Sequence, residues 1–482
     1  MNILYNKHNS VCHYERGVEF DMYEPVMAKY QNDMLRDLKE LVAIESVAVR
    51  DTAAGDFPFG GKSAEAIAFM LSLGQKMGLA TENCDNYACH AQLGEGKADD
   101  YAAVLCHVDV VPVGDGWGTN PLVLTEKDGY LYGRGVADDK GAAIVALYCL
   151  KAMKANGVPM KRPVRCIFGG GEEIGMDDME HYFSKHPLPA FAFTPDADYP
   201  ACHCEKGILH LQFTGPTDAA FLSVQGGSAI NCVADRCTAG MNCDAATANA
   251  IAARINAGGA ECTVSPAENG YAVSVTGVSA HAMCPEKGVN AINCLLTAAE
   301  KASVLTQGSA EWFFAGRLCG DTNGKGLGID CADETSGELT LNVGTIAAAD
   351  GLSTLRVDIR YPATLDSTPL IQKITEQAGT YGVSVEVIHD NPPLYIPKDH
   401  PLLRTLGECY TEITGQPMVP MAMGGGTYAR ALHGRGVAFG PVFPDAPPSN
   451  LHMPNENLPV DDLMRHAEIC YRAMCRLAQL EV

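Results

Sequence analysis

The feature that most constrains the fold is an ordered series of short apolar runs, each followed by polar residues flanked by Gly or Pro. Four such clusters of metal-suited side chains lie at residues 106–109, 133–141, 171–175 and 195–198. Apolar runs of strand length that alternate with helical patterns are typical of a mostly parallel sheet covered by helices. Because ligands gather in loops at the carboxyl ends of such strands, the series predicts an α/β domain with one site at a sheet edge.

The expected elements follow this alternation. Apolar periodicity predicts helices at 22–47, 63–77, 140–155, 402–414 and 461–480, and strands at 102–105, 164–168, 191–194 and 437–440. After residue 207 strands and helices continue, at 208–213, 221–224, 245–255, 271–275 and 289–305, but metal-suited clusters become rare. We therefore predict a catalytic domain built from residues 1–207 and 389–482, with a mostly parallel central sheet, and an inserted α+β lid domain at 208–388.

Composition narrows the partners and the compartment. A net charge of -23 disfavours binding to nucleic acid or to anionic membranes. No run of about 18 apolar residues predicts a membrane span, and residues 1–16 lack the apolar core of a signal peptide. The 19 cysteines include no C-x-x-C pair, so we expect reduced thiols in a cytoplasmic protein.

Two short motifs suit metal-dependent hydrolysis. In an extended strand, residues i and i+2 face the same way, so Asp109 can orient the imidazole of His107 toward a metal. The adjacent Glu172 and Glu173 face different ways, so one can bind a metal while the other faces a water molecule on that metal. A hydrolase needs this division between a ligand and a proton acceptor.

Electrostatics also predicts bound metal. If the strand ends converge, five carboxylates share one cleft, and crowded carboxylates raise one another's pKa. Divalent cations would keep them ionised. A mixed set of imidazoles and carboxylates suits Zn²⁺, Mn²⁺ or Co²⁺ and is too rich in nitrogen for Ca²⁺. The five carboxylates are those of Asp109, Asp138, Glu172, Glu173 and Asp196.

Each cluster taken alone has a simpler explanation. A single His-x-Asp is usually a loop or a helix cap, Asp138 and Asp139 could cap the helix predicted to begin at Lys140, and Glu172 with Glu173 could be a solvated pair. The recurrence of the clusters at successive strand ends favours one shared site.

Taken together, the motifs resemble those of the co-catalytic metallopeptidases, a family that includes aminoacylase, carboxypeptidase G, carnosinase and, as the most similar branch, bacterial dipeptidase V. The matching segments are 107–109, 133–141, 171–173, 195–196 and 452–456. The resemblance implies a zinc-exopeptidase-like catalytic domain with two Zn²⁺ per chain, for which Mn²⁺ or Co²⁺ could substitute. Implied as ligands are His107 and Asp196 on one ion, His452 and Glu173 on the other, and Asp138 between them.

The same resemblance implies the remaining roles. Glu172 is the general base, Asp109 orients a ligand, and a cis peptide follows Asp138. The lid motif at 277–288 implies that His281 polarises the scissile carbonyl with help from Asn231. The residues implied for holding the C-terminal carboxylate of the substrate are Arg360, Gly425 and Thr427.

We therefore expect an enzyme that hydrolyses dipeptides or short peptides. A large lid can complete the active site within one chain, which favours a monomer, although a homodimer stays open. Two alternatives remain: an N-acyl-amino-acid or acyl-diamine deacylase that uses the same metals, and a non-catalytic protein that binds metal or peptide.

Overall fold

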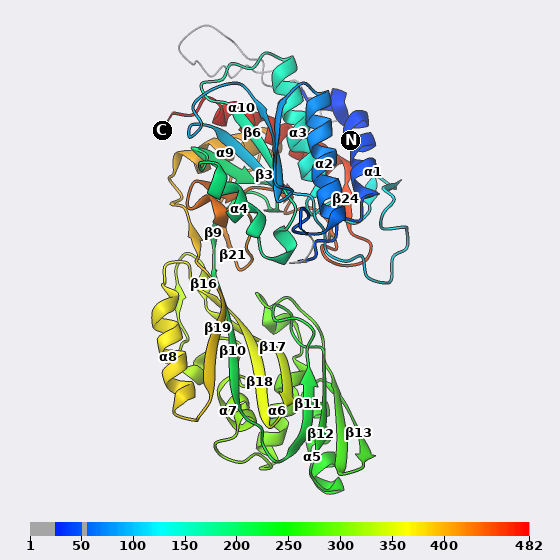
Figure 1. Cartoon of the computed structure of the whole chain (residues 1–482), viewed down its shortest axis with the longest axis vertical. Helices are drawn as coiled ribbons and strands as arrows, with labels where there is room; N and C mark the ends of the chain where they lie inside the picture. The colour runs from blue at the N-terminus through cyan, green and yellow to red at the C-terminus, as the bar shows by residue number, and fades with distance from the viewer. Residues whose placement is uncertain (1–24, 51–54, 482) are drawn as a thin grey trace.

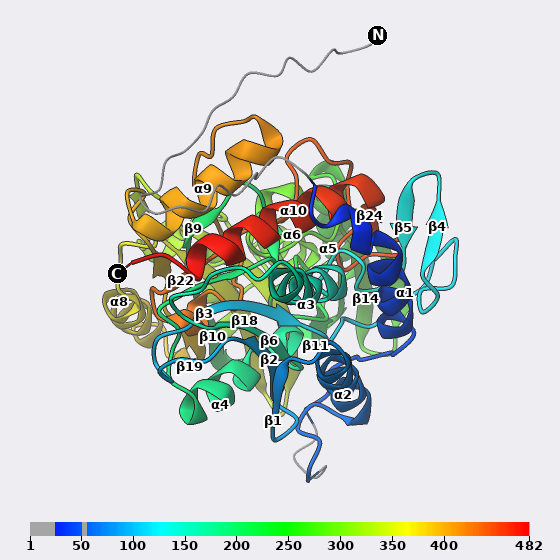
Figure 2. The same ribbon diagram turned by 90° about the horizontal axis from the view of Figure 1, so that it is seen from above.

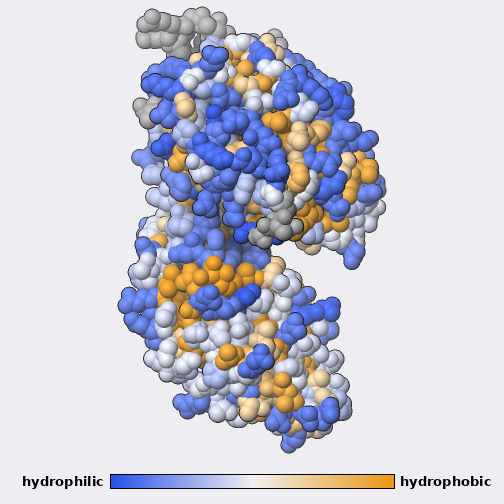
Figure 3. All heavy atoms as spheres, viewed as in Figure 1, coloured by the Kyte–Doolittle hydropathy of each residue, from blue (hydrophilic) through white to orange (hydrophobic). Residues whose placement is uncertain are grey.

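The computed structural model describes residues 25–50 and 55–481 of the chain. It has two lobes joined by a narrow neck (Figure 1), and the space-filling view shows a hollow between them (Figure 3). Residues 1–16, for which no signal peptide was predicted, and the start of the helix predicted at 22–47 lie outside the described residues. Within the described ranges, no helix has the length and apolar character needed to cross a bilayer.

The first lobe is built on a nine-stranded sheet. Its order is β1 (Ala80–Cys84), β2 (Ala88–Leu93), β6 (Val164–Gly169), β3 (Ala102–His107), β7 (Phe191–Thr194), β22 (Gly436–Ala438), β9 (Cys202–Glu205) and β20 (Leu394–Tyr395), with β21 (Met421–Met423) beside β9. The four central strands β6, β3, β7 and β22 are parallel, whereas β1, β2 and β20 pair antiparallel at the edges. The predicted α/β fold class is confirmed, with parallel pairing concentrated at the centre of a mixed sheet.

Helices cover both faces of this sheet (Figure 2). On one face lie α1 (Gln31–Val42), α2 (Gly61–Lys76), α3 (Lys140–Ala155), α9 (Pro401–Thr414) and α10 (Val460–Leu477). Nearly every side chain of α3 is buried, because α1 and α10 enclose it against the sheet. On the opposite face, α4 (Asp177–Lys185) packs Met179 and Tyr182 against a smaller apolar cluster.

The second lobe is an antiparallel sheet with helices on one face. The strand order is β13 (Glu261–Ala267), β14 (Gly270–Thr276), β12 (Arg236–Met241), β11 (Phe221–Gly226), β17 (Thr340–Ala349), β18 (Leu352–Tyr361), β10 (Gly207–Pro216) and β19 (Ser384–Asn391). The helices α5 (Ala245–Ala257), α6 (Ala291–Lys301), α7 (Ala310–Arg317) and α8 (Ser367–Gly379) contribute to its single core. The chain enters the second lobe through β10 and leaves it through β19, and these two strands pair with each other. The domain boundaries at residues 207 and 388 stay a prediction.

Short elements complete the fold. They are β4 (Thr125–Lys127), β5 (Tyr130–Tyr132), β24 (Asn457–Pro459), β8 (Ala197–Asp198), β23 (Pro441–Val442), β15 (Ala332–Asp333), β16 (Gly337–Glu338), and the 3-10 turns η1 (Ala28–Tyr30), η2 (Glu172–Ile174), η3 (Pro285–Lys287), η4 (Lys325–Leu327) and η5 (Arg430–Leu432). Strand β24 pairs with β5, which brings the segment after His452 beside the loop that precedes α3.

Two predicted helices are shorter than expected. The helix predicted at 289–305 begins at Ala291, because the side chain of Asn290 caps its first turn, and ends at Lys301. Within the helix predicted at 22–47, the α-helix proper covers Gln31–Val42. The β1–β2 hairpin was not predicted from the sequence, because its first strand carries mostly polar side chains.

Candidate active site

One carboxylate lies at the centre of the predicted site. Asp138, in the loop before α3, places Oδ1 2.8 Å from Nε2 of His107 and Oδ2 3.0 Å from Nε2 of His452. His107 ends strand β3, and His452 lies more than three hundred residues further along the chain. The peptide bond between Asp138 and Asp139 is cis, as the family resemblance predicted.

Two groups of donor atoms share this carboxylate. In the first group Nε2 of His107 is 3.9 Å from Oδ1 of Asp196, which comes two residues after β7. In the second, Nε2 of His452 is 3.2 Å from Oε1 of Glu173 in η2. Within each group all donor atoms lie within 4.8 Å of one another. The structure therefore brings together the five side chains that were predicted as metal ligands.

Asp109 contacts both the imidazole of His107 and the turn that carries Glu172 and Glu173. One carboxylate oxygen lies 3.4 Å from Nδ1 of His107, and the backbone carbonyl of Asp109 is 3.0 Å from the same nitrogen. The carboxylate also accepts the backbone N–H groups of Glu172 at 3.2 Å and Glu173 at 3.1 Å. The predicted proximity to the imidazole is present, and the hold on the Glu172–Glu173 turn is an addition that the sequence did not predict.

Glu456 is the residue that sequence reasoning missed, although it belongs to a matching motif. Its buried carboxylate accepts backbone N–H groups from Gly135, Ala137 and Asp138 at 3.0 to 3.3 Å, and Nη1 of Arg134 at 2.7 Å. These contacts fix the loop that carries the shared carboxylate. No periodicity or spacing signals them, because the acceptor lies some 320 positions away from the donors.

The electrostatics of the cluster favour a cation. Burial, with neighbouring carboxylates, raises the pKa of Glu172 well above its ordinary value, that of Glu173 to about 7, and also that of Asp196. Although burial opposes it, hydrogen bonding to the two imidazoles lowers the pKa of Asp138. Carboxylates crowded in this way need positive charge to stay ionised. Two imidazoles and three carboxylates form a donor set that fits two divalent transition-metal ions.

His281 lies on the lid lobe, in the loop between β14 and η3. Desolvation, together with the positive charges of Arg360 and His452, lowers the pKa of His281. The backbone carbonyl of Asn231 accepts the N–H of Ala282 at 2.9 Å, which places Asn231 beside His281.

Arg360 links the lid to the glycine loop of the first lobe. Its Nε and Nη2 donate to the carboxylate of Asp358 at 2.6 and 2.7 Å, and its Nη1 donates to the carbonyl of Gly424 at 2.9 Å. Gly425 lies next in this loop. Thr427 is buried, and its hydroxyl donates to Oε1 of Glu205 at 2.8 Å. The substrate-binding roles of these residues stay predictions.

Imidazoles and carboxylates gathered around one shared aspartate, at the strand ends of a helix-covered α/β sheet, are typical of two-metal hydrolases. Residues 103–476 match the family model of Peptidase family M20/M25/M40, and the chain belongs to this family. The resemblance drawn from the motifs is thereby confirmed, and the protein is a peptide-hydrolysing enzyme of the metallopeptidase class.

Relatives match along nearly the full chain. The Bacillus subtilis protein named "Putative dipeptidase YtjP" is 36% identical over 471 residues, covering 95% of this chain and all of the relative. Among solved structures, human carnosine dipeptidase 1 matches with a TM-score of 0.56 at 17% identity, over 94% of this chain and 98% of its own. The dipeptidase Dug1p of Saccharomyces cerevisiae matches with a TM-score of 0.58 at 13% identity, over 95% and 98%. These two structures support the fold.

Proposed function

We propose that the protein is a dipeptidase that uses two Zn²⁺ ions. The observation that carries the proposal is the position of Asp138, whose two oxygens each face a different imidazole, as a bridging ligand requires. His107 and Asp196 would hold one ion, and His452 and Glu173 the other. The name of the Bacillus subtilis relative supports dipeptides as the substrate class.

Glu172 is assigned as the general base. A bound divalent cation supplies Lewis acidity, which activates water and polarises a carbonyl. The carboxylate of Glu173 contacts His452. Burial and nearby charges raise the pKa of Glu172, whose carboxylate forms no hydrogen bond within the described part of the chain. The uncommitted carboxylate of Glu172 accepts a proton from the attacking water and returns it to the leaving amine. Asp109 fixes the backbone of both glutamates, and therefore the direction in which each one points.

The lid residues are assigned to the substrate. His281 donates to the oxygen of the scissile carbonyl, where charge develops as water attacks, with Asn231 beside it. Arg360 binds the C-terminal carboxylate together with Gly425 and Thr427. Three of the five N–H groups of Arg360 are used by Asp358 and Gly424, so two remain for a carboxylate. A guanidinium held in this way is already oriented before substrate arrives.

Substitution of Glu172 by Gln tests the catalytic assignment. The variant should keep both metals, since Glu172 is not a ligand, and should lose about 10²–10⁴-fold in kcat, the usual contribution of a general base. The matched variant Glu173→Gln should instead lose metal. Metal content and dipeptide turnover are measured on both variants. A Glu172→Gln enzyme that keeps wild-type turnover would remove Glu172 from the mechanism.

Substrate class is tested with paired substrates. Unmodified dipeptides are assayed beside the same dipeptides carrying an N-acetyl group, and beside N-acetyl and N-succinyl amino acids. We expect cleavage to require a free N-terminus. Preference for the acylated amino acids would show a deacylase. Activity should disappear on treatment with a chelator and return with Zn²⁺.

A further inference from the structure

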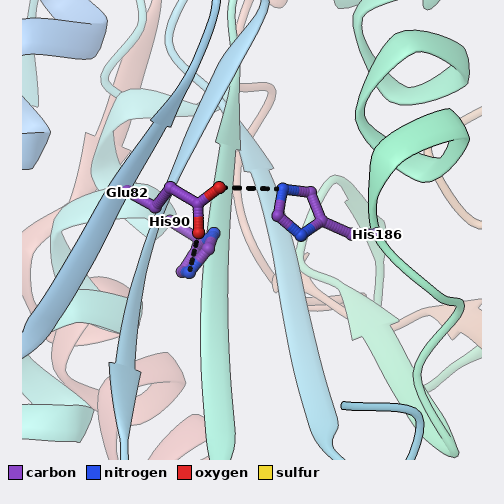
Figure 4. A group of neighbouring side chains, drawn as sticks. All are labelled: Glu82, His90 and His186. Carbon is purple, nitrogen blue, oxygen red and sulfur yellow. Dashed lines mark ion pairs between the residues drawn. The ribbon is translucent and has the colours of Figure 1, made fainter.

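A second set of metal-suited side chains lies on the face of the first sheet that α4 covers. It consists of Glu82 on β1, His90 on β2 and His186 at the end of α4 (Figure 4). None of the three belongs to the groups around Asp138. The residues therefore form a cluster that the proposed peptidase mechanism does not use.

Backbone geometry aims the three side chains at one point. Glu82 and His90 are direct partners in the antiparallel β1–β2 register, so both project from the same face of the sheet. His186 ends α4: its N–H donates to the carbonyl of Tyr182 at 3.0 Å, and its backbone is already extended. Figure 4 shows both imidazoles directed at the carboxylate of Glu82.

The distances between donor atoms suit an ion better than direct hydrogen bonds. Oε1 of Glu82 is 3.4 Å from Nε2 of His186, and Oε2 is 3.9 Å from Nε2 of His90. The second distance is too long for a hydrogen bond. A tetrahedral zinc ion about 2.0–2.1 Å from its ligands separates them by roughly 3.3–3.5 Å. All three donor atoms already lie within 4.8 Å of one another, so modest movements of the side chains would bring them to these separations.

Tyr182 orients both imidazoles. Its Oη lies 3.0 Å from Nδ1 of His90, and Nη1 of Arg165 donates to the same Oη at 2.9 Å. Its ring stacks on that of His186 with centroids 4.4 Å apart. A histidine that binds metal through one nitrogen usually has a hydrogen-bond partner on the other. Burial lowers the pKa of His186 and that of His90, the latter to about 3, so both rings are neutral near pH 7, the form that binds metal.

A neighbouring cluster on the same hairpin is not suited to a metal ion. There the carboxylate of Asp85 lies 2.8 Å from Nε2 of His181 and also accepts the ammonium of Lys185. A lysine charge already occupies the place that a metal ion would take. His181 is on α4, five positions before His186, and therefore provides a matched control.

We propose that Glu82, His90 and His186 form a third metal site, which takes a zinc-class divalent ion. Glu82 is 56% exposed, so water can complete the coordination. The ion would fasten the end of α4 to the β1–β2 hairpin. The start of α4 is fixed to the loop that carries Glu172, because the carboxylate of Asp178 accepts the N–H of Gly171 at 2.9 Å. A third ion would thus steady the support of that loop without touching the substrate.

The test counts zinc on the full chain. Wild type, Glu82→Gln, His186→Asn and His181→Gln are equilibrated with micromolar free Zn²⁺, freed of excess, and measured by mass spectrometry of the metal. We expect Glu82→Gln and His186→Asn each to carry one zinc per chain fewer than wild type, and His181→Gln to match wild type. The comparison is a difference between variants, so it holds whatever number of ions the Asp138 cluster binds.

Crystals of the zinc-loaded protein locate the ion. An anomalous peak between Glu82, His90 and His186, absent from Glu82→Gln, is the expected result. Equal zinc content in all four proteins would overturn the proposal. So would a site that fills only at millimolar zinc, or an anomalous map that has no peak there.

Discussion

Glu456→Gln tests whether one buried carboxylate holds the loop that carries the shared aspartate. Oε1 of Glu456 accepts the N–H groups of Ala137 and Asp138, and Oε2 accepts the guanidinium of Arg134, which is itself buried. The N–H of Gly135 is shared by both oxygens. Glutamine has nearly the same shape but only one acceptor oxygen. Whichever way the amide is turned, its NH₂ group faces protein donors, so at least one of them loses its partner.

The cost follows from these contacts. Removing one partner of a buried ion pair typically destabilises a protein by about 3–5 kcal/mol, because the remaining charge is left uncompensated. Burial, with the nearby charge of Asp138, raises the pKa of Glu456 although hydrogen bonds act against the shift. We therefore expect the lower end of the range, about 3 kcal/mol. Since domains are stable by only about 5–15 kcal/mol, this loss is easily measured.

Denaturant unfolding of the chelated protein measures the loss as a shift of the midpoint at constant slope. The control is Glu408→Gln, the same substitution at a mostly exposed carboxylate 3.4 Å from Arg476. A surface pair of this kind contributes about 0–1 kcal/mol. Zinc affinity should also fall in Glu456→Gln and stay unchanged in the control. If both variants unfold at the same midpoint and bind zinc equally, Glu456 does not support the loop.

Two further substitutions test the roles of individual buried side chains. Asp109→Asn weakens the hold on His107 and on the N–H groups of Glu172 and Glu173, so zinc affinity should fall about 10–100-fold in a titration against a competing chelator; unchanged affinity would contradict the orienting role. Burial lowers the pKa of His466 to about 3, so its contribution to stability is complete above the unfolded pKa of about 6.5 and is lost as the pH falls toward 3, by up to about 1.4 kcal/mol per pH unit. The stability advantage of wild type over His466→Gln should therefore shrink between pH 7 and pH 5, and parallel stability curves would refute this.

The metal-suited residues of the first half of the chain could be predicted because they end or follow apolar runs, whereas His452 was implied by the family resemblance alone. His107 closes the buried strand β3, and Asp196 comes two residues after β7. Parallel strands bring their carboxyl ends to one edge of the sheet, so sequence order alone places such residues together. The bounds of α3 could also be predicted from the sequence, since the predicted and the observed helix both cover Lys140–Ala155.

Other parts of the structure depend on contacts that leave no local pattern. Strand β1 carries Glu82 and Asn83, residue types that are depleted in strands, and it forms because β2 pairs with it. The cluster of Glu82, His90 and His186 was invisible for the same reason: it depends on the register of an unpredicted hairpin. Glu456 lies in the matching segment 452–456, but the sequence does not reveal its role, because its partners are backbone groups and the Arg134 side chain of a distant loop.

The supporting contacts bear on how the site is formed. The loop that carries Asp138 is held by Glu456, and the turn that carries Glu172 and Glu173 is held by Asp109. In both cases a carboxylate binds backbone N–H groups, so the direction of each proposed ligand is set by the protein itself. A site fixed in this way loses little conformational entropy when ions bind, which favours both affinity and precise placement of the general base. Substitutions in this supporting layer should therefore alter metal affinity and turnover together, whereas substitutions in the lid should alter turnover at constant metal content.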